Sequence, residues 1–436
     1  MWSSYTLPEL RLKRFMLFYN RNRAATAVFV LICNSLVLAG QWQVIDVGDR
    51  GRISAISFAA DGRLWVGGES RVVTSQNGLT EWQSFDVDQN VGILANITAV
   101  EDNSVIAVGE GVSKYSLANG EWKSLINIDE SSNSFTDYCK MSQNRGFVSS
   151  IISSRVTYDG DESFQRLNDD QAAEVPKPCF RGSVGDDGVV FIAGSADGTP
   201  DYFGMVARSK DSGTTWKSVV PLSPETRKLN FLSISTRDGQ SVIATGQQYN
   251  VETEELVGKI IYSVNGGETW NQTSTEFSHP VTDVAMVDGS LAFCVDERGL
   301  LYRTTNAGLD WHPAEKPDGR RILSVAASKD GIIYIGGLSG LLARMAGVSS
   351  VSVDSTTVRI SSKPVAISRS GTLRDVMGRV EFSGTVRILT IDGSLVFEST
   401  SNRYPEDIPL DVLNRGVFVC MISGDGVHSM RVFSIW

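Results

Sequence analysis

Apolar residues in this chain occur in short runs separated by glycines and Asp-Gly turns, without the three-to-four-residue spacing of amphipathic helices. Residues 53–68 show the basic pattern, which reads as a strand, a turn at Asp61-Gly62 and a second strand ending in glycines. The pattern recurs at 231–246 and 322–337. A closely similar stretch lies at 281–295, and three less similar stretches lie at 97–109, 135–149 and 180–194. We expect each copy to form two antiparallel strands.

A second pattern, [ST]-x-[DN]-x-G-x-x-W, follows the paired strands. Three full copies occupy Ser209, Asp211, Gly213 and Trp216; Ser263, Asn265, Gly267 and Trp270; and Thr304, Asn306, Gly308 and Trp311. Degenerate copies retain Ser75, Asn77 and Trp82 in one repeat, Trp122 in the next, and Asp159 with Phe164 in a third. We call this eight-residue turn the clasp.

The residue types of the clasp suit a turn between two strands. An Asp or Asn side chain and a hydroxyl can accept hydrogen bonds from nearby backbone N–H groups. Glycine supplies a left-handed backbone conformation, and the aromatic ring covers the turn. We therefore assign the clasp residues a structural role.

Each repeat also contains a third strand that leads into the clasp and a fourth that begins at the clasp aromatic. Four antiparallel strands per repeat are typical of a propeller blade. The clasp aromatics fall at positions 82, 122, 164, 216, 270 and 311, so the interval is 40 to 54 residues, as expected for blade repeats. The sequence predicts an all-β fold.

The last repeat, residues 321–345, has three strands and no clasp. The segment Trp42-Gln-Val-Ile resembles the missing fourth strand, and Trp82 follows Trp42 at the blade interval. We expect this segment to complete the last blade and close a ring over residues 41–345. This count gives a seven-bladed propeller; six blades, with one segment misassigned, is the alternative.

The first 40 residues are typical of a secretory signal peptide. Arg21 and Arg23 precede the apolar run 24–39, and Ala39-Gly40 offers a cleavage site. The run is short for a spanning helix, and Met16 is an alternative start. A retained membrane anchor and a lipoprotein attached at Cys33 are the weaker alternatives.

Composition excludes several function classes. A formal charge of −10 and a pI near 5.0 argue against nucleic-acid binding, which needs a basic surface. Three histidines make a histidine-rich metal site improbable, and no spacing of the EF-hand type supports calcium. The glycine-rich stretch 336–340 lacks the features of a phosphate loop. We expect no cofactor.

Four cysteines follow the predicted signal peptide: Cys139, Cys179, Cys294 and Cys420. An oxidising compartment would permit disulfides. Cys139 and Cys179 begin similar segments of successive repeats, so a bond between them is one expectation. Buried free thiols are the other.

The clasps resemble the Asp-box, or BNR, repeats of sialidases, sortilin-type receptors and photosystem II stability/assembly-factor-like propellers. The resemblance covers about residues 41–345. It implies the architecture and leaves the chemistry open, because function on a shared fold depends on the site.

Residues 367–436 resemble the C-terminal sorting domain of proteins exported by the type IX secretion system. The similar segments are a strand–turn–strand at 386–396, the stretch 408–419 and a final strand at 428–436. The Pro-Asn-Pro signature of that family is absent. The resemblance implies a small β-sandwich that contacts the secretion machinery, after a linker at 346–366; an adhesive β-sandwich is the alternative.

Two functions remain open. One is a non-catalytic binding propeller, secreted or at the outer-membrane surface, that recognises an extracellular protein or glycan and meets the membrane only by surface attachment. Its binding face would carry the insertions between blades and between second and third strands, with Asp169, Asp170, Tyr202, Phe203, Tyr249, Glu252 and Glu254. The other is a sialidase-like glycoside hydrolase. The Phe/Tyr-Arg-Ile-Pro motif of sialidases is absent, and Phe180-Arg181-Gly is the nearest match.

Overall fold

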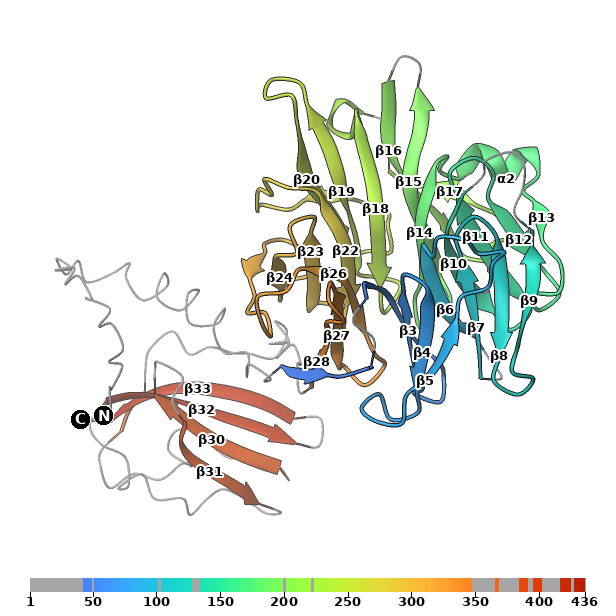
Figure 1. Ribbon diagram of the computed structural model, residues 1–436. Coiled ribbons are helices and arrows are strands. Elements are labelled where there is room, and N and C mark those ends of the chain that lie inside the picture. The colour runs from blue at the N-terminus through green and yellow to red at the C-terminus, as the bar shows by residue number, and fades with distance from the viewer. Residues whose placement is uncertain are drawn as a thin grey trace, which may run out of the picture. The chain divides into compact units, whose positions relative to one another are not determined.

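The computed structural model (Figure 1) describes residues 42–48, 51–100, 103–127, 134–198, 201–220 and 223–346, and five strands between 365 and 435. The chain divides into two compact units, one with the first 28 strands and one with the last five. The predicted signal peptide and most of the predicted linker lie outside the described residues. No helix among the described residues is long and apolar enough to cross a membrane.

The larger unit is a seven-bladed β-propeller in which every blade is a four-stranded antiparallel sheet. Blade 1 contains β2 (Ile53–Phe58), β3 (Leu64–Gly68), β4 (Arg71–Ser75) and β5 (Gln83–Asp86). Blade 2 contains β6 (Asn96–Val100), β7 (Ser104–Val108), β8 (Val112–Ser116) and β9 (Glu121–Ile126). Blade 3 contains β10 (Phe135–Ser142), β11 (Arg145–Ser150), β12 (Arg155–Thr157) and β13 (Gln165–Arg166).

The next blades repeat this order. Blade 4 contains β14 (Cys179–Val184), β15 (Val190–Gly198), β16 (Asp201–Ser209) and β17 (Lys217–Ser218). Blade 5 contains β18 (Leu229–Thr236), β19 (Val242–Asn250), β20 (Glu255–Ser263) and β21 (Asn271–Gln272). Blade 6 contains β22 (Val281–Met286), β23 (Ala292–Asp296), β24 (Leu301–Thr304) and β25 (His312–Pro313).

The seventh blade closes the ring as the sequence predicts. It joins β26 (Ile322–Ala327), β27 (Ile333–Gly337) and β28 (Leu342–Met345) to the N-terminal strand β1 (Gln43–Ile45). Strand β1 pairs antiparallel with β28, with Val44 opposite Ala343. The seven-blade prediction is confirmed, and the six-blade alternative is wrong.

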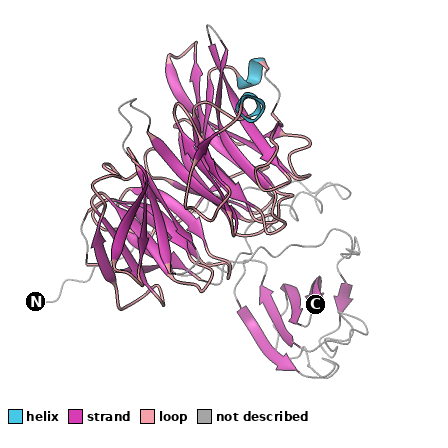
Figure 2. Ribbon diagram, turned by 90° about the vertical axis from the view of Figure 1, so that its right-hand side faces the viewer, coloured by secondary structure: helices cyan, strands magenta, loops and turns pink. Residues whose placement is uncertain are grey.

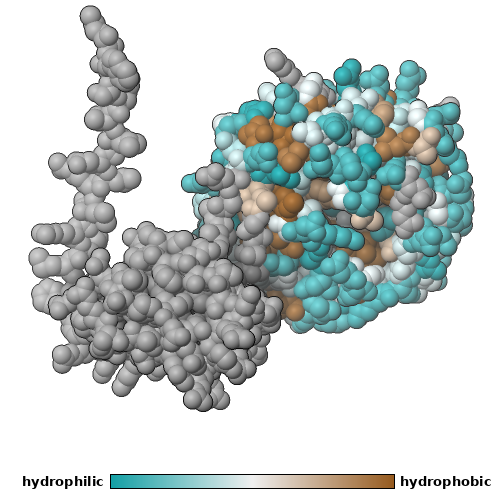
Figure 3. All heavy atoms as spheres, turned by 90° about the horizontal axis from the view of Figure 1, so that it is seen from below, coloured by the Kyte–Doolittle hydropathy of each residue, from teal (hydrophilic) through white to brown (hydrophobic). Residues whose placement is uncertain are grey.

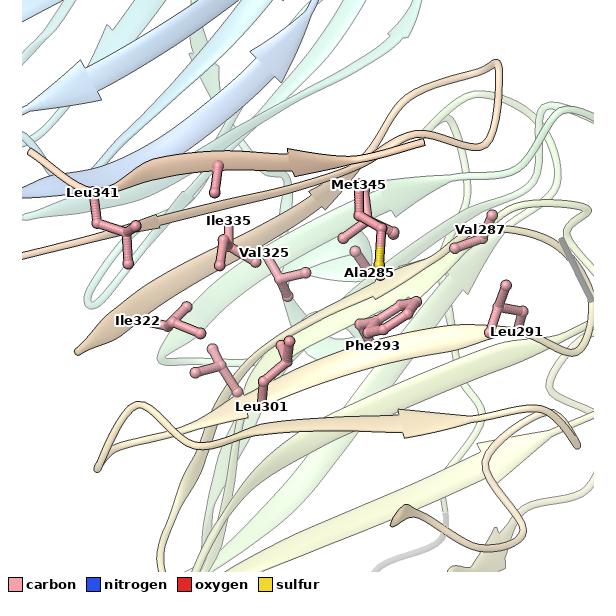
Figure 4. Close-up of a cluster of buried hydrophobic side chains, with 13 residues drawn as sticks. Ala285, Val287, Leu291, Phe293, Leu301, Ile322, Val325, Ile335, Leu341 and Met345 are labelled. Atoms are coloured by element: carbon pink, nitrogen blue, oxygen red, sulfur yellow. The ribbon is translucent and has the colours of Figure 1, made fainter. Parts of the chain in front are cut away.

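Apolar side chains fill the space between neighbouring blades. Between blades 6 and 7, Phe293 and Leu301 pack with Ile322, Ile335 and other aliphatic side chains (Figure 4). The middle strands β23 and β27 are buried along their whole length. These strands read as short unbroken apolar runs because both faces of each sheet are covered by another blade.

Six of the seven innermost strands contain a β-bulge at the same place. The register shifts after Ile53, Phe135, Cys179, Phe231, Val281 and Ile322. A bulge redirects the side chains that follow it. The residues that follow the shift are Ala55, Asp137, Arg181, Ser233, Asp283 and Ser324. Five of these six residues are polar, although the strands themselves are largely apolar.

The fold departs from the prediction in its helical segments (Figure 2). Helix α2 (Asp169–Glu174) and the short 3₁₀ turn η1 (Pro224–Thr226) lie in two connections between blades. The amide oxygen of Asn168 accepts a hydrogen bond from the Gln171 N–H, and the amide oxygen of Gln171 accepts one from the Asn168 N–H. This reciprocal cap satisfies N–H groups at the start of the helix.

Two insertions that the sequence suggested as loops are strand extensions. Residues 195–198 and 201–203 lengthen the β15–β16 hairpin, whose strands are paired from Val190↔Ser209 to Gly198↔Asp201. Residues 247–257 lengthen the β19–β20 hairpin in the same way. Pairing satisfies backbone groups that an irregular loop would leave to water.

The expected Cys139–Cys179 disulfide is absent, and both residues are buried free thiols, as is Cys294. Cys179 precedes the bulge in β14 and matches Phe135 of β10, so Cys139 lies beside Gly182 instead. Burial raises the pKa of the Cys179 thiol to about 12. Both side chains belong to one apolar cluster between blades 3 and 4.

The smaller unit contains one five-stranded sheet in the order β29-β33-β32-β30-β31. Its strands are β29 (Val365–Ile367), β30 (Gly384–Thr390), β31 (Leu395–Ser401), β32 (Gly416–Gly424) and β33 (Val427–Ile435). The β30–β31 hairpin and the last strand agree with the strands predicted there. The rest of the predicted sandwich and Cys420's side chain lie outside the described features.

Candidate functional site

The clasp turns contain the side-chain-to-backbone hydrogen bonds that their sequence predicts. In blade 4 the Ser209 hydroxyl bonds to Asp211 at 2.8 Å and accepts from the Gly213 N–H at 2.8 Å. Equivalent bonds start at Ser75, Thr157, Ser263 and Thr304. These polar atoms are therefore engaged within the turns, which favours a structural role.

Blade 3 departs from the clasp pattern at the glycine as well as at the tryptophan, where it has Phe164. Asp161 takes the place of the glycine and adopts a left-handed backbone with φ of 73°, which is costly for most side chains. Its buried carboxylate pairs with Lys140 at 2.6 Å and accepts a hydrogen bond from the Tyr138 hydroxyl. These two bonds supply partners for the buried charge. In the same turn, hydrogen bonds from Ser163 lower the pKa of Asp159 to about 2.

The propeller presents two different faces. The clasps share one face with the turns between first and second strands, because successive strands of a blade run antiparallel (Figure 1). The opposite side, which we call the loop-rich face, carries the turns between second and third strands and the ends of the inter-blade connections. On the surface visible in Figure 3, apolar side chains are scattered among polar ones.

The structure brings three of the predicted binding residues together on the loop-rich face. Tyr202 and Phe203 belong to the long hairpin of blade 4, and Tyr249 belongs to that of blade 5. Lys228 connects the two hairpins through its backbone. Its N–H donates to the Tyr202 carbonyl at 2.7 Å, and its carbonyl accepts from the Tyr249 N–H at 3.0 Å. The Lys228 ammonium also lies 5.0 Å from the centre of the Tyr249 ring.

The predicted acidic residues do not form one site with these aromatics. Glu252 and Glu254 are exposed at the tip of the β19–β20 hairpin. Asp169 and Asp170 lie in the first turn of α2, where negative charge stabilises a helix. Gln171 of that helix donates to the carbonyl of Thr214, in the clasp of blade 4. This helix therefore lies beside a clasp, while Tyr202 and Tyr249 belong to the long hairpins of the opposite face.

Exposed apolar side chains concentrate on the loop-rich face. Of the eleven large hydrophobic residues that are exposed in the described part of the chain, six lie in its turns and connections, and Leu256 lies in β20 near the tip of the β19–β20 hairpin. These seven are Ile93, Ile151, Ile152, Val251, Leu256, Leu300 and Leu338. Three others lie in clasps: Tyr158, Val264 and Leu309. The seven on the loop-rich face come from the connection between blades 1 and 2 and from blades 3, 5, 6 and 7, so they are spread around that face.

The central channel contains a cavity of about 470 Å³ that is lined by the innermost strands of the blades. Its lining carries the cationic side chains of Lys140, Arg181, Arg237 and Lys329 and one acidic side chain, Asp283. This lining contrasts with the net charge of −10 of the whole chain.

Two aspartates beside the channel connect different blades. Asp137 accepts hydrogen bonds from the Asn96 amide at 2.5 Å and the Gly182 N–H at 2.8 Å. Burial raises the pKa of Asp137. Asp283 accepts from the Ser233 hydroxyl at 2.9 Å and the Val325 N–H at 3.0 Å. Both carboxylates thus accept hydrogen bonds from residues of neighbouring blades.

Arg181 lies in the channel near these acids, with its guanidinium 3.5 Å from Asp283. Burial lowers the pKa of Arg181, but the charges of Asp283 and Asp137 raise it by more. In the sequence, Arg181 was identified only in a partial match to the sialidase motif, and Asp137 and Asp283 were not identified. Aligning the innermost strands would have shown a polar residue at the same place in five repeats.

Within the described residues, no cluster of histidine, cysteine and carboxylate side chains could hold a metal ion. A scan of known protein families finds no match to the sequence, and a search of curated proteins also finds none.

Solved structures do share the fold. YCF48 bound to a D1 peptide is 13% identical, with a TM-score of 0.50, over 70% of this chain and 96% of that one. Virginiamycin B lyase from Staphylococcus aureus is 10% identical, with a TM-score of 0.51, over 70% and 98%. The extracellular domain of a putative one-component system from B. thetaiotaomicron is 11% identical, with a TM-score of 0.52, over 89% and 47%. At these identities the likeness establishes the propeller alone.

Proposed function

We propose that this chain is a non-catalytic binding protein of the cell surface or extracellular space, and that its propeller holds a protein partner on the loop-rich face. The observation that carries the proposal is the concentration of exposed apolar side chains there. Six of these seven are Ile or Leu and the seventh is Val, so all of them are aliphatic. Aliphatic groups favour a protein partner over a glycan, which stacks best on aromatic rings.

The channel geometry argues against the glycoside hydrolase alternative. Such enzymes need two carboxyl groups that are free to act across a cleft. Asp137 and Asp283 instead accept hydrogen bonds from Gly182 and Val325 of adjacent blades. The propeller of YCF48 provides a precedent for binding, since it has been solved with a D1 peptide.

The partner-binding proposal predicts different results for the two faces. The full chain carrying Ile151→Ser, Ile152→Ser and Val251→Ser should lose affinity for its partner by more than about tenfold, because buried anchors contribute most of an interface's binding energy. Partners are first captured with wild-type chain from cell-envelope and extracellular fractions. Each is then purified, and its Kd is measured by calorimetry.

The matched control replaces two exposed apolar clasp residues, Val264→Ser and Leu309→Ser. It should leave both the Kd and the thermal unfolding of the chain unchanged. Equal affinity of the loop variant and the wild type, or equal losses in both variants, would contradict a partner site on the loop-rich face.

Export is the second part of the proposal. The signal-peptide pattern at 1–40 and the resemblance of 367–436 to type IX sorting domains support it. In a host with that system, a chain lacking 367–436 should accumulate in the periplasm, while the full chain reaches the surface. Cell fractionation and immunoblotting distinguish these outcomes, and surface delivery of the truncated chain would refute the sorting role.

A further inference from the structure

The channel contains hydrogen-bond donors that the protein itself leaves unused. Arg181 has several N–H donors, yet among the described residues its guanidinium has one ion pair, at 3.5 Å from Asp283. The Arg181 side chain is 27% exposed, so a small molecule in the cavity can reach it.

The two aspartates near Arg181 interact with its charge but leave most of its N–H donors without a hydrogen-bond partner among the described residues. Burial lowers the pKa of Arg181, and the charges of Asp283 and Asp137 offset that effect. Their oxygens accept other hydrogen bonds, from Asn96, Gly182, Ser233 and Val325. A ligand therefore meets a charged guanidinium with free donors. Of the other cationic side chains in the lining, Lys140 pairs with Asp161 and Arg237 pairs with Asp186.

We propose that the central channel binds a carboxylate, which Arg181 receives through paired N–H donors. The planar fork of a guanidinium matches the two oxygens of a carboxylate. A cavity of about 470 Å³ falls within the range of small-molecule sites. The carboxylate can belong to a free organic acid or to the end of a polypeptide. This site is independent of the partner proposed for the loop-rich face.

Calorimetry on the full chain tests the proposal with paired probes. Acetate, succinate and benzoate are each compared with the corresponding amide, and a hexapeptide with a free C-terminus is compared with its amidated form. We expect saturable binding of at least one carboxylate and none of its amide. Binding of a free acid identifies a small ligand; binding of the free-ended peptide alone identifies a chain terminus. Absence of binding by all carboxylates would refute the site.

Two variants locate the site. Arg181→Gln should weaken binding by ~10- to 100-fold, the loss expected for a charge-assisted hydrogen-bonded contact. Arg237→Gln removes the same charge elsewhere in the channel lining and should have a smaller effect. The assignment to Arg181 is wrong if Arg181→Gln binds the carboxylate as tightly as wild type does, or if Arg237→Gln loses as much affinity as Arg181→Gln.

Discussion

Replacement of Asp283 by alanine should destabilise the propeller by about 3–5 kcal/mol, the cost of removing one partner from a buried charged network. Asp283 belongs to blade 6, and it contacts Arg181 of blade 4, Ser233 of blade 5 and Val325 of blade 7. Without this carboxylate, the Val325 N–H, the Ser233 hydroxyl and the Arg181 guanidinium each lose a partner. Differential scanning calorimetry should show a melting temperature lower by roughly 5–15 °C.

An exposed aspartate provides the control for this experiment. Asp330 lies in the turn between β26 and β27, and Asp330→Ala should change the stability by less than about 0.5 kcal/mol. Asp283→Asn keeps the shape of the side chain and one acceptor oxygen. Its loss of stability should therefore lie between those of Asp330→Ala and Asp283→Ala. A melting temperature for Asp283→Ala that equals that of Asp330→Ala would show that this carboxylate does not join the blades.

The blade architecture could be predicted because its signals are local. A strand pair with a central Asp-Gly turn and a clasp eight residues long each lie within one repeat, so repetition reinforces them. Closure by residues 43–45 was also predictable, since the last repeat lacks a fourth strand. Helix α2 left a local signal too: the Asn168–Gln171 spacing is that of a reciprocal cap, which the search for strands overlooked.

The channel was harder to predict because its contacts join different repeats. Asp137, Arg181 and Asp283 meet only after the ring closes, and nothing in a single repeat shows which carboxylate is satisfied by a neighbouring blade. The bulges add a one-residue shift that changes where each side chain points. The same shift explains why Cys139 and Cys179, which looked equivalent, occupy different levels of adjacent strands.

Deletion of residues 42–47 should have the largest effect, because it removes the strand that closes the ring. Ile45 and Val47 are 4% and 7% exposed and pack between blades 7 and 1 with Leu342. The Trp42 indole N–H donates to the Glu315 carbonyl at 2.8 Å. Because a buried aliphatic side chain contributes about 2–5 kcal/mol, we expect a loss of at least about 5 kcal/mol. Urea unfolding measures it.

The deletion should also expose the backbone edge of β28, which is a template for pairing with another chain. We expect the shortened protein to self-associate in size-exclusion chromatography with light scattering. A synthetic peptide of residues 42–47 should restore the monomer and part of the stability by refilling the edge. Val44→Ser is the control, since Val44 is 48% exposed on the same strand and its loss should change stability little. A deleted chain that remains monomeric and as stable as wild type would show that the ring holds without this strand.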